Sequence, residues 1–177
     1  MAEDRSNIIL IGMPGSGKST VGVILARLTA RNFVDTDVLI QTAHHRTLQD
    51  IVNTDGYMAL RAIEEDVILK FECRNCVIAT GGSAVYSPAA MAHLKSHGIA
   101  VFLYVDLRTL KARVRDYETR GLAKRPDQSL DDLFTERLAL YRKYADVTVD
   151  CISLTHEDVR AGIIKELETI KGYSKIE

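Results

Sequence analysis

The sequence predicts an α/β fold, a three-layer sandwich in which helices cover both faces of a five-stranded parallel sheet. Five short apolar runs of strand length alternate with amphipathic segments of helical spacing. The first run, residues 8–11, is apolar throughout, as a strand buried on both faces would be. Parallel strands must be joined by crossovers, and right-handed crossovers place helices on both faces of the sheet.

The five expected strands are short and mostly apolar. They are residues 8–11, 32–35, 77–80, 99–105 and 147–149. Gly12, Asp35, Asp37 and Gly81 fall at or just beyond the carboxyl ends of the first three strands. Because open α/β sheets bind their ligands at this edge, we expect a functional site there.

Helical spacing of apolar residues predicts six helices. The first begins at Lys18, with Arg27 and Arg31 on the side opposite its apolar stripe. Thr155 and Asp158 have the spacing of a capping box and predict the start of the last helix. The helices between these two are residues 56–73, 88–97, 107–117 and 130–144. The irregular, charge-rich stretch at about residues 117–129 is a candidate mobile lid.

The bulk properties favour a small cytoplasmic protein. A chain of 177 residues fits one domain, residues 1–177, with a core of its own. The net charge of -1 argues against the broad cationic surface that nucleic-acid binding requires. No apolar run approaches the roughly 18 residues of a membrane span, and no signal region is evident. We therefore expect a monomer whose partners are small molecules, and neither nucleic acid nor membrane.

Three residue pairs could in principle bind a metal or a substrate: Cys73 and Cys76, His93 and His97, and His44 and His45. The C-x-x-C spacing occurs in redox pairs and zinc sites, but the sequence offers no second such pair. We expect a structural role for the cysteines and a packing or solvated role for His93 and His97. The role of His44 and His45 stays open.

Residues 12–19, Gly-Met-Pro-Gly-Ser-Gly-Lys-Ser, match the phosphate-binding pattern G-x-x-x-x-G-K-[ST] between an apolar strand and an amphipathic helix. Glycines let successive backbone N–H groups point at phosphate oxygens, and the helix presents the positive end of its dipole to the same anion. We therefore expect a P-loop NTPase fold that binds ATP with Mg²⁺. The residues expected to contact ATP are Gly15, Ser16, Gly17, Lys18, Ser19 and Thr20. Lys18 would reach the β- and γ-phosphates during catalysis, and the Ser19 hydroxyl would ligate Mg²⁺.

Asp35 and Asp37 lie at the end of the second strand, beside the phosphate loop in this architecture. A carboxylate near Mg²⁺ can hold a metal-bound water, and one that faces the acceptor can orient its hydroxyl and take its proton. We expect one aspartate to serve the metal and the other the acceptor. The alternative is an ordinary helix cap.

In their order and spacing, these motifs resemble the shikimate kinase family over about residues 8–150. Besides the phosphate loop and the two aspartates, the resemblance includes Gly56 followed by Arg61 and Glu64, the turn at residues 79–82, Arg125-Pro126, and Glu136-Arg137. It implies that Asp37 contacts the acceptor hydroxyls and is the catalytic base. It also implies that Asp35 lies near Mg²⁺ through water.

The resemblance further assigns the arginines and the glycine turn. Arg61 and Arg137 would grip the carboxylate of the acceptor, which a guanidinium fork matches in geometry. Gly81 and Gly82 would present backbone N–H groups to the acceptor, and Glu64 would orient Arg61. Arg125 would act as a catalytic residue that closes over the ATP phosphates, with Arg120 flanking the nucleotide.

The chain departs from the family pattern on the acceptor side and in the lid. Ser83 replaces the third glycine after Thr80, Tyr57 replaces the usual glutamate after Gly56, and Leu60 replaces a phenylalanine. The lid reads Arg-Pro-Asp in place of Arg-Pro-Leu-Leu. These changes leave the phosphate-binding residues untouched, so they bear on which acceptor is bound.

The resemblance implies a phosphotransferase that uses an alcohol as acceptor and converts shikimate to shikimate 3-phosphate. One alternative is a kinase of the same fold for gluconate, homoserine or a nucleoside monophosphate. Two carboxylate-gripping arginines favour an acidic acceptor. Another alternative is a nucleotide-binding regulator that has lost acceptor chemistry, but such a switch needs a water-positioning group rather than an acceptor base such as Asp37.

Overall fold

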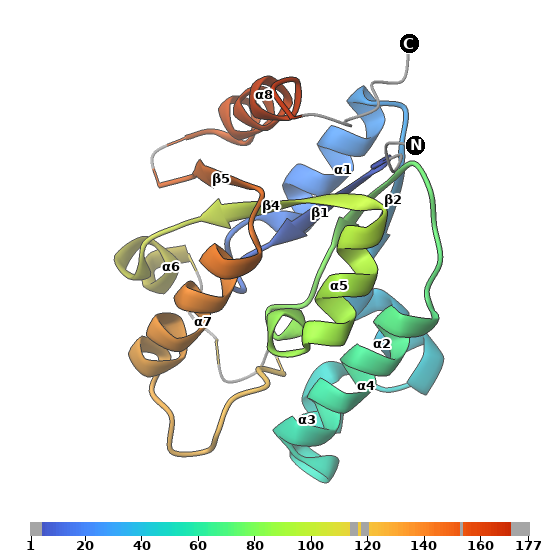
Figure 1. The fold of residues 1–177 in the computed structure, drawn as a ribbon. Helices are drawn as coiled ribbons and strands as arrows, with labels where there is room; N and C mark the ends of the chain where they lie inside the picture. The colour runs from blue at the N-terminus through green and yellow to red at the C-terminus, as the bar shows by residue number, and fades with distance from the viewer. Residues whose placement is uncertain (1–4, 114–116, 118–120, 153, 171–177) are drawn as a thin grey trace.

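The computed structural model describes residues 5–113, 117, 121–152 and 154–170 of the chain. Its centre is a parallel sheet with the strand order β2-β3-β1-β4-β5 (Figure 1). The strands are β1 (Asn7–Ile11), β2 (Asn32–Asp35), β3 (Cys76–Ala79), β4 (Gly98–Tyr104) and β5 (Val147–Asp150). Each lies within one residue of its predicted bounds.

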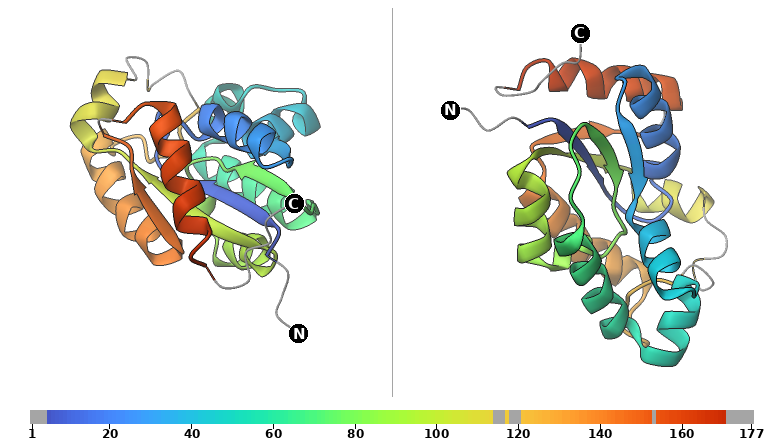
Figure 2. Two further views of the ribbon diagram at one scale, coloured as in Figure 1. Left: turned by 90° about the horizontal axis from the view of Figure 1, so that it is seen from above. Right: turned by 90° about the vertical axis from the view of Figure 1, so that its right-hand side faces the viewer.

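Helices form the two outer layers (Figure 1 and Figure 2). One face of the sheet is covered by α1 (Lys18–Leu28) and α8 (His156–Leu167). The other is covered by α5 (Pro88–Ser96) and α7 (Leu130–Tyr144), with α4 (Tyr57–Lys70) packed on α5. The short helix α6 (Leu107–Arg113) follows the carboxyl end of β4. The predicted three-layer sandwich is therefore confirmed.

The core lies around the three central strands because they are apolar on both faces. Every residue of β1 and β3 is buried, whereas the edge strand β5 alternates between buried and exposed positions. Asp35 pairs with Ala79 across β2 and β3, and Ala79 pairs with Leu10 of β1. This register brings the residues that follow the three strands to one edge of the sheet.

Two helices, α2 (Thr36–His44) and α3 (Leu48–Asp55), lie in a stretch for which the sequence pattern predicted none. The Asp35 side chain caps α2 by accepting the backbone N–H of Asp37 at 3.0 Å. Thr47 and Asp50 form a capping box at the start of α3. Apolar periodicity could not reveal α3, because Ile51 is its one buried side chain.

These helices and α4 enclose a small second core. It comprises Ile40, Ile51, Leu60 and Ala123. Ala123 belongs to the described part of the predicted lid region, so this second core joins α2–α4 to that segment.

The remaining helices mostly match their predicted bounds. The predicted bounds of α7 match its observed ones, and Thr155 and Asp158 form the predicted capping box of α8. The prediction that Arg31 lies on the exposed side of the first helix is wrong. Arg31 is buried just beyond α1, and its Nε donates to the Ser6 carbonyl oxygen at 3.0 Å.

Cys73, Cys76, His93 and His97 lie near the amino ends of β3 and β4, away from the carboxyl edge of the sheet. His44 and His45 lie at the end of α2 and do not line the cavity at that edge. Cys73 and Cys76 are free thiols. His93 Nε2 lies 2.9 Å from the Phe71 carbonyl oxygen, and His97 Nε2 lies 3.3 Å from Arg74 Nη2. Within the described ranges, no three His, Cys, Asp or Glu side chains are placed to hold a metal ion together. No helix among the described residues combines the length and the apolar character needed to cross a membrane.

Two glycines in helix interiors provide a matched test of this packing. A Cβ added at Gly22 of α1 would lie 2.5 Å from Phe33 Cε2, whereas one at Gly162 of α8 would lie 3.6 Å from Val149 Cγ1, an ordinary contact. Alanine stabilises a helix over glycine by about 0.5–1 kcal/mol. We expect Gly162→Ala to raise the free energy of unfolding by about that amount. Gly22→Ala should lower it by about 1–3 kcal/mol, because the ring of Phe33 must shift.

Denaturant unfolding of both variants measures these changes. If the two alanines stabilise the protein equally, Phe33 of β2 can move aside without cost, and its contact with Gly22 does not constrain the fold.

Candidate active site

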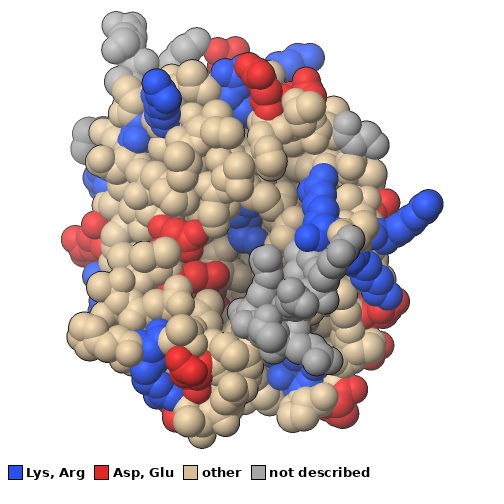
Figure 3. All heavy atoms as spheres, turned by 180° about the vertical axis from the view of Figure 1, so that it is seen from behind, with Lys and Arg blue, Asp and Glu red and all other residues tan. Residues whose placement is uncertain are grey.

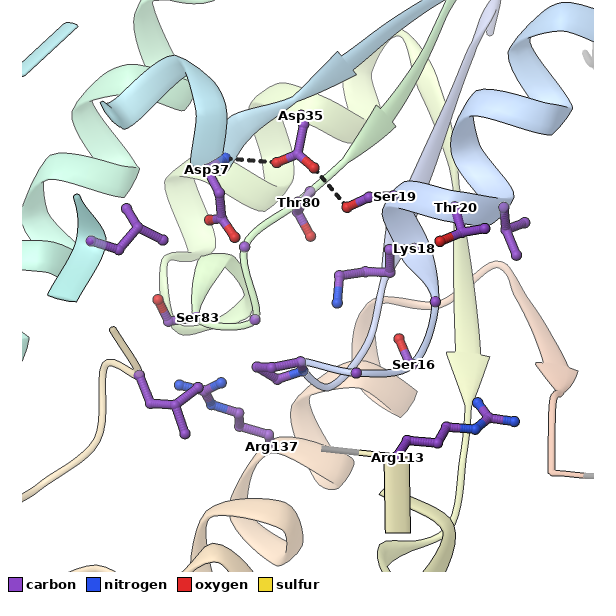
Figure 4. Close-up of a pocket in the computed structure, with 18 of the residues that line it drawn as sticks. Ser16, Lys18, Ser19, Thr20, Asp35, Asp37, Thr80, Ser83, Arg113 and Arg137 are labelled. Carbon is purple, nitrogen blue, oxygen red and sulfur yellow. Dashed lines mark hydrogen bonds between the residues drawn. The ribbon is translucent and has the colours of Figure 1, made fainter. Parts of the chain in front are cut away.

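A cavity of about 810 Å³ opens at the carboxyl edge of the sheet. Its wall combines the phosphate loop, Asp35 at the end of β2, Asp37 in α2, the turn after β3, Arg137 of α7 and residues 121–123. Seen from behind, the molecule is hollowed on this side, and basic and acidic side chains lie next to one another in the hollow (Figure 3). Figure 4 shows Lys18 pointing into the cavity between Asp37 and Arg137.

The phosphate loop is open for an anion. Gly15 and Gly17 have φ values of 86° and 96°, a region that glycine adopts without steric cost. No side chain caps α1, and its first turn holds no acidic residue, so its N–H groups and dipole face the cavity. Ser16 Oγ is buried and has no hydrogen-bond partner among the described residues. The loop and the helix thus offer hydrogen-bond donors to a phosphate group.

Lys18 is the buried cation of the loop. Its Nζ donates to the carbonyl oxygens of Gly12 and Met13, at 2.8 and 2.9 Å. Burial lowers the pKa of Lys18 to about 8, although the charges of Asp37 and Asp35 oppose the shift. The ammonium is therefore poorly solvated and available to a stronger anionic partner.

Ser19 and Asp35 form an oxygen-rich corner beside Lys18. Ser19 Oγ donates to Asp35 Oδ2 at 2.7 Å, while Asp35 Oδ1 accepts the N–H of Asp37 (Figure 4). Asp35 can therefore cap α2 and also ligate a metal ion, because Oδ1 accepts the capping hydrogen bond and Oδ2 faces Ser19. A hydroxyl and a carboxylate are the hard oxygen ligands that suit Mg²⁺ when phosphates and water complete its shell. Thr20 lines the same part of the cavity and is exposed.

Asp37 and Glu64 bring two carboxyl groups to one side of the cavity. Burial, and next the charge of Asp35, raises the pKa of Asp37 to about 6. Burial, and next the charge of Asp37, raises the pKa of Glu64 to about 7. Glu64 is 2% exposed, although polar residues follow it on α4. Its Oε2 accepts a hydrogen bond from the Ser83 hydroxyl, while Oε1 is buried without a partner among the described residues.

The glycine turn fits between these carboxyl groups. A Cβ at Gly81 would lie 2.6 Å from Asp37 Oδ1 and closer still to Glu64, so any larger residue would displace them. The Gly81 N–H donates to Thr36 Oγ1 at 2.9 Å, and the Gly82 carbonyl accepts the Tyr141 hydroxyl at 2.7 Å. In this structure the Gly81 amide is therefore used to hold the turn in place.

The two arginines expected to bind a carboxylate converge on one atom. Arg61 Nη2 and Arg137 Nη2 donate to the carbonyl oxygen of Ala123, at 3.0 and 3.1 Å. Arg137 is buried and Arg61 is partly buried. The Nε atoms of both are buried with no partner in the part of the chain that the structure describes. Arg137 lines the cavity, whereas Arg61 lies outside its wall and meets Arg137 at the Ala123 carbonyl.

Arg125 does not join this group. Its Nη1 lies 3.4 Å from Glu136 Oε2, and its side chain is about half exposed. Among the described residues, the cations in the cavity wall are Lys18, Arg113 and Arg137. Arg120 and residues 118 and 119 of the predicted lid lie outside the described residues.

Sequence reasoning missed the residues at the nucleotide-binding end. Arg113 of α6 lines the cavity and donates from Nη2 to the Cys151 carbonyl oxygen at 3.0 Å. Thr155 and His156, at the start of α8, line it too. Their capping motif revealed the helix but not its approach to the phosphate loop, which depends on the packing of α8 on α1.

Comparison with known proteins agrees with this geometry. The family profile described as shikimate kinase matches residues 14–168. The shikimate kinase of Rippkaea orientalis is 38% identical over 93% of this chain and 89% of its own length. Shikimate kinase 2 of an Enterobacter species is 35% identical, over 90% of this chain and 94% of its own length.

Solved structures extend the agreement to the fold. The structure of the Acinetobacter baumannii shikimate kinase in complex with shikimate has a TM-score of 0.86 and 31% identity, covering 96% of this chain and 97% of its own. The Aquifex aeolicus shikimate kinase has a TM-score of 0.77 and 34% identity, covering 92% and 96%. A thymidylate kinase from Candida albicans, at 14% identity and a TM-score of 0.60, shares the fold alone. With a matching family profile over most of its length and relatives above 30% identity, the chain belongs to the shikimate kinase family.

Proposed function

We propose that this chain transfers the γ-phosphoryl group of Mg²⁺-bound ATP to a hydroxyl of shikimate, forming shikimate 3-phosphate. One observation carries the proposal. Arg137, which shares the Ala123 carbonyl oxygen with Arg61, lines the same cavity as the phosphate loop and the carboxyl group of Asp37. Shikimate carries a carboxylate and hydroxyls, and the relative from Acinetobacter baumannii was solved in complex with it.

The phosphate side binds ATP through backbone and side-chain donors. The amides of Gly15 and Gly17, with Ser16 and Thr20, surround the phosphates, and Lys18 exchanges its two loop carbonyls for phosphate oxygens. Ser19 and Asp35 would hold Mg²⁺, which, when bound, neutralises charge on the β- and γ-phosphates. The absence of a side-chain cap on α1 supports this reading.

The acceptor side orients one hydroxyl for attack. Arg61 and Arg137 bind the acceptor carboxylate, since each guanidinium can donate two parallel hydrogen bonds. Asp37 accepts the proton as the hydroxyl oxygen bonds to phosphorus and the β-phosphate oxygen of ADP leaves with the bonding electrons. Gly81 and Gly82 keep side chains out of this space.

The proposal also includes closure of the lid and a monomeric state. Arg125 would leave Glu136 to reach the ATP phosphates when residues 117–129 close, which would shield the transfer from water. Residues 1–177 would act as one kinase domain, in a cytoplasmic monomer.

The acceptor is tested by measuring ADP release with Mg²⁺-ATP across shikimate, gluconate, homoserine and nucleoside monophosphates. We expect the highest turnover with shikimate, because Arg61 and Arg137 suit a carboxylate and the relatives reported above are shikimate kinases. Turnover with another acid but not with shikimate would contradict the proposal and direct attention to Ser83 and Tyr57. ATP hydrolysis without acceptor dependence would favour the nucleotide-binding regulator.

Replacing Asp37 tests the base. We expect Asp37→Asn to lower kcat by about 100-fold or more while the KM for ATP changes little. Asp66→Asn is the matched control, because it removes one carboxylate from the exposed, Lys70-paired face of α4. Ionised Asp37 costs stability above its raised pKa, so the Asn variant should melt no lower than the parent at about pH 8. A rate near that of the parent would exclude Asp37 from proton transfer.

The raised and lowered pKa values predict the pH profile. As pH falls through about 6, Asp37 takes up a proton and kcat/KM for shikimate should fall. As pH rises through about 8, Lys18 loses its proton and kcat/KM for ATP should fall. Initial rates between about pH 5 and 9 measure both limbs. Persistence of the acid limb in the Asp37→Asn variant would assign it to another group.

A further inference from the structure

Arg61 and Arg137 bring two like charges into contact with the same atom. Both donate to the Ala123 carbonyl oxygen, at 3.0 and 3.1 Å, and Arg137 is only 1% exposed. Burial lowers the pKa of Arg61, and the neighbouring charge of Arg137 acts in the same direction. One of these cations is buried and the other partly buried, so the pair needs a compensating partner, because a single carbonyl dipole does not balance two cations.

Carboxylates act on this pair only without a direct ion pair: Glu136 on Arg61, and Asp37 and Glu64 on Arg137. Among the described residues, no Asp or Glu forms an ion pair with either guanidinium. Glu64 lies one helical turn after Arg61 on α4, where it could have paired with it, but it accepts the Ser83 hydroxyl instead. The serine that replaces the family's third glycine therefore holds Glu64 in a hydrogen bond, and Glu64 forms no ion pair with Arg61.

Aromatic rings surround Arg61 instead. The Cζ of Arg61 lies 3.5 Å from the ring centroid of Tyr86 and 5.3 Å from that of Tyr57. The Cζ of Arg137 lies 5.5 Å from the same Tyr86 ring, so one ring faces both cations. The negative face of an aromatic ring attracts a guanidinium, and the attraction grows when water is excluded. Tyr57 is the residue that replaces the glutamate usual after Gly56.

Tyr86 is held in place by the surrounding backbone. It ends the short helix η1 (Ala84–Tyr86), which packs against α4, α5 and α7. The next residue, Ser87, caps α5 by accepting the N–H of Ala90 at 3.0 Å. The Tyr86 hydroxyl is buried beside Glu136, and its ring faces the Arg61 guanidinium.

We propose that Tyr86 is a positioning residue that holds Arg61 and Arg137 convergent, ready to receive the carboxylate of the acceptor. Tyr57 adds a second, more distant ring on Arg61. This inference rests on the proposed function, because a positioned arginine pair matters only if the acceptor carries a carboxylate.

Steady-state kinetics with shikimate and ATP test the inference on the variants Tyr86→Leu and Tyr86→Phe. We expect Tyr86→Leu to raise the KM for shikimate about 3- to 30-fold, the range of one desolvated cation–π contact. The KM for ATP and kcat should change less than about twofold, since uniform binding of the acceptor is what is lost. Tyr86→Phe keeps the ring and should restore the KM of the parent.

Two further variants serve as a control and as a substitute. Tyr144→Leu removes a ring that lies 5.0 Å from Lys143 Nζ, near the end of α7, and should leave the KM for shikimate unchanged. If Tyr86→Leu fails to bind ATP, Tyr86→Met, which is apolar and more flexible, is judged by the same criteria.

The outcomes separate this inference from the proposed function. An active parent whose Tyr86→Leu variant keeps its KM for shikimate would overturn the positioning role alone. So would a Tyr86→Phe variant as impaired as Tyr86→Leu, since the hydroxyl would then be the acting group. A parent enzyme inactive with shikimate would overturn both.

Discussion

The ammonium group of Lys18 links the two halves of the site. It is buried, it is held by two carbonyl oxygens of its own loop, and it lies near the carboxyl groups of Asp35 and Asp37. A buried cation is stable only where carbonyl dipoles and acids surround it, so the loop, the end of β2 and the first turn of α2 must keep their places together. The sheet register provides that constraint by ending β1, β2 and β3 at one level.

The acids near this lysine also have pKa values that differ from their usual ones. Burial raises the pKa of both Asp37 and Glu64, and burial lowers that of Lys18. Opposed shifts of this kind bring acid and base groups close to neutral pH, where proton transfer is most effective. Burying these charged groups in surroundings of low polarity costs free energy. The same surroundings would strengthen each electrostatic contact with a triphosphate and a carboxylate.

Much of this arrangement could be predicted from the sequence because it follows from local pattern. The strands were located by apolar runs, the phosphate loop by its glycines and lysine, and the placement of Asp35 and Asp37 by the rule that strand ends share an edge. What could not be predicted depends on contacts between distant segments. The helices α2 and α3 bury too few apolar residues to show a period, and Glu64 looks like a surface acid until the turn at Gly81–Ser83 covers it. Arg113 and Tyr86 carry no motif, and their positions follow from how α6 and η1 pack.

The carbonyl of Ala123 gives the open site a further property. It satisfies one donor of each acceptor-side arginine, so a carboxylate that takes both guanidinium groups must compete with this peptide oxygen. Ala123 also belongs to the small core shared with α2, α3 and α4. Displacing its carbonyl would loosen residues 121–123, which belong to the proposed lid. Binding of one substrate at one end of the cavity would thereby change the affinity for the other substrate at the opposite end, which is a thermodynamic linkage.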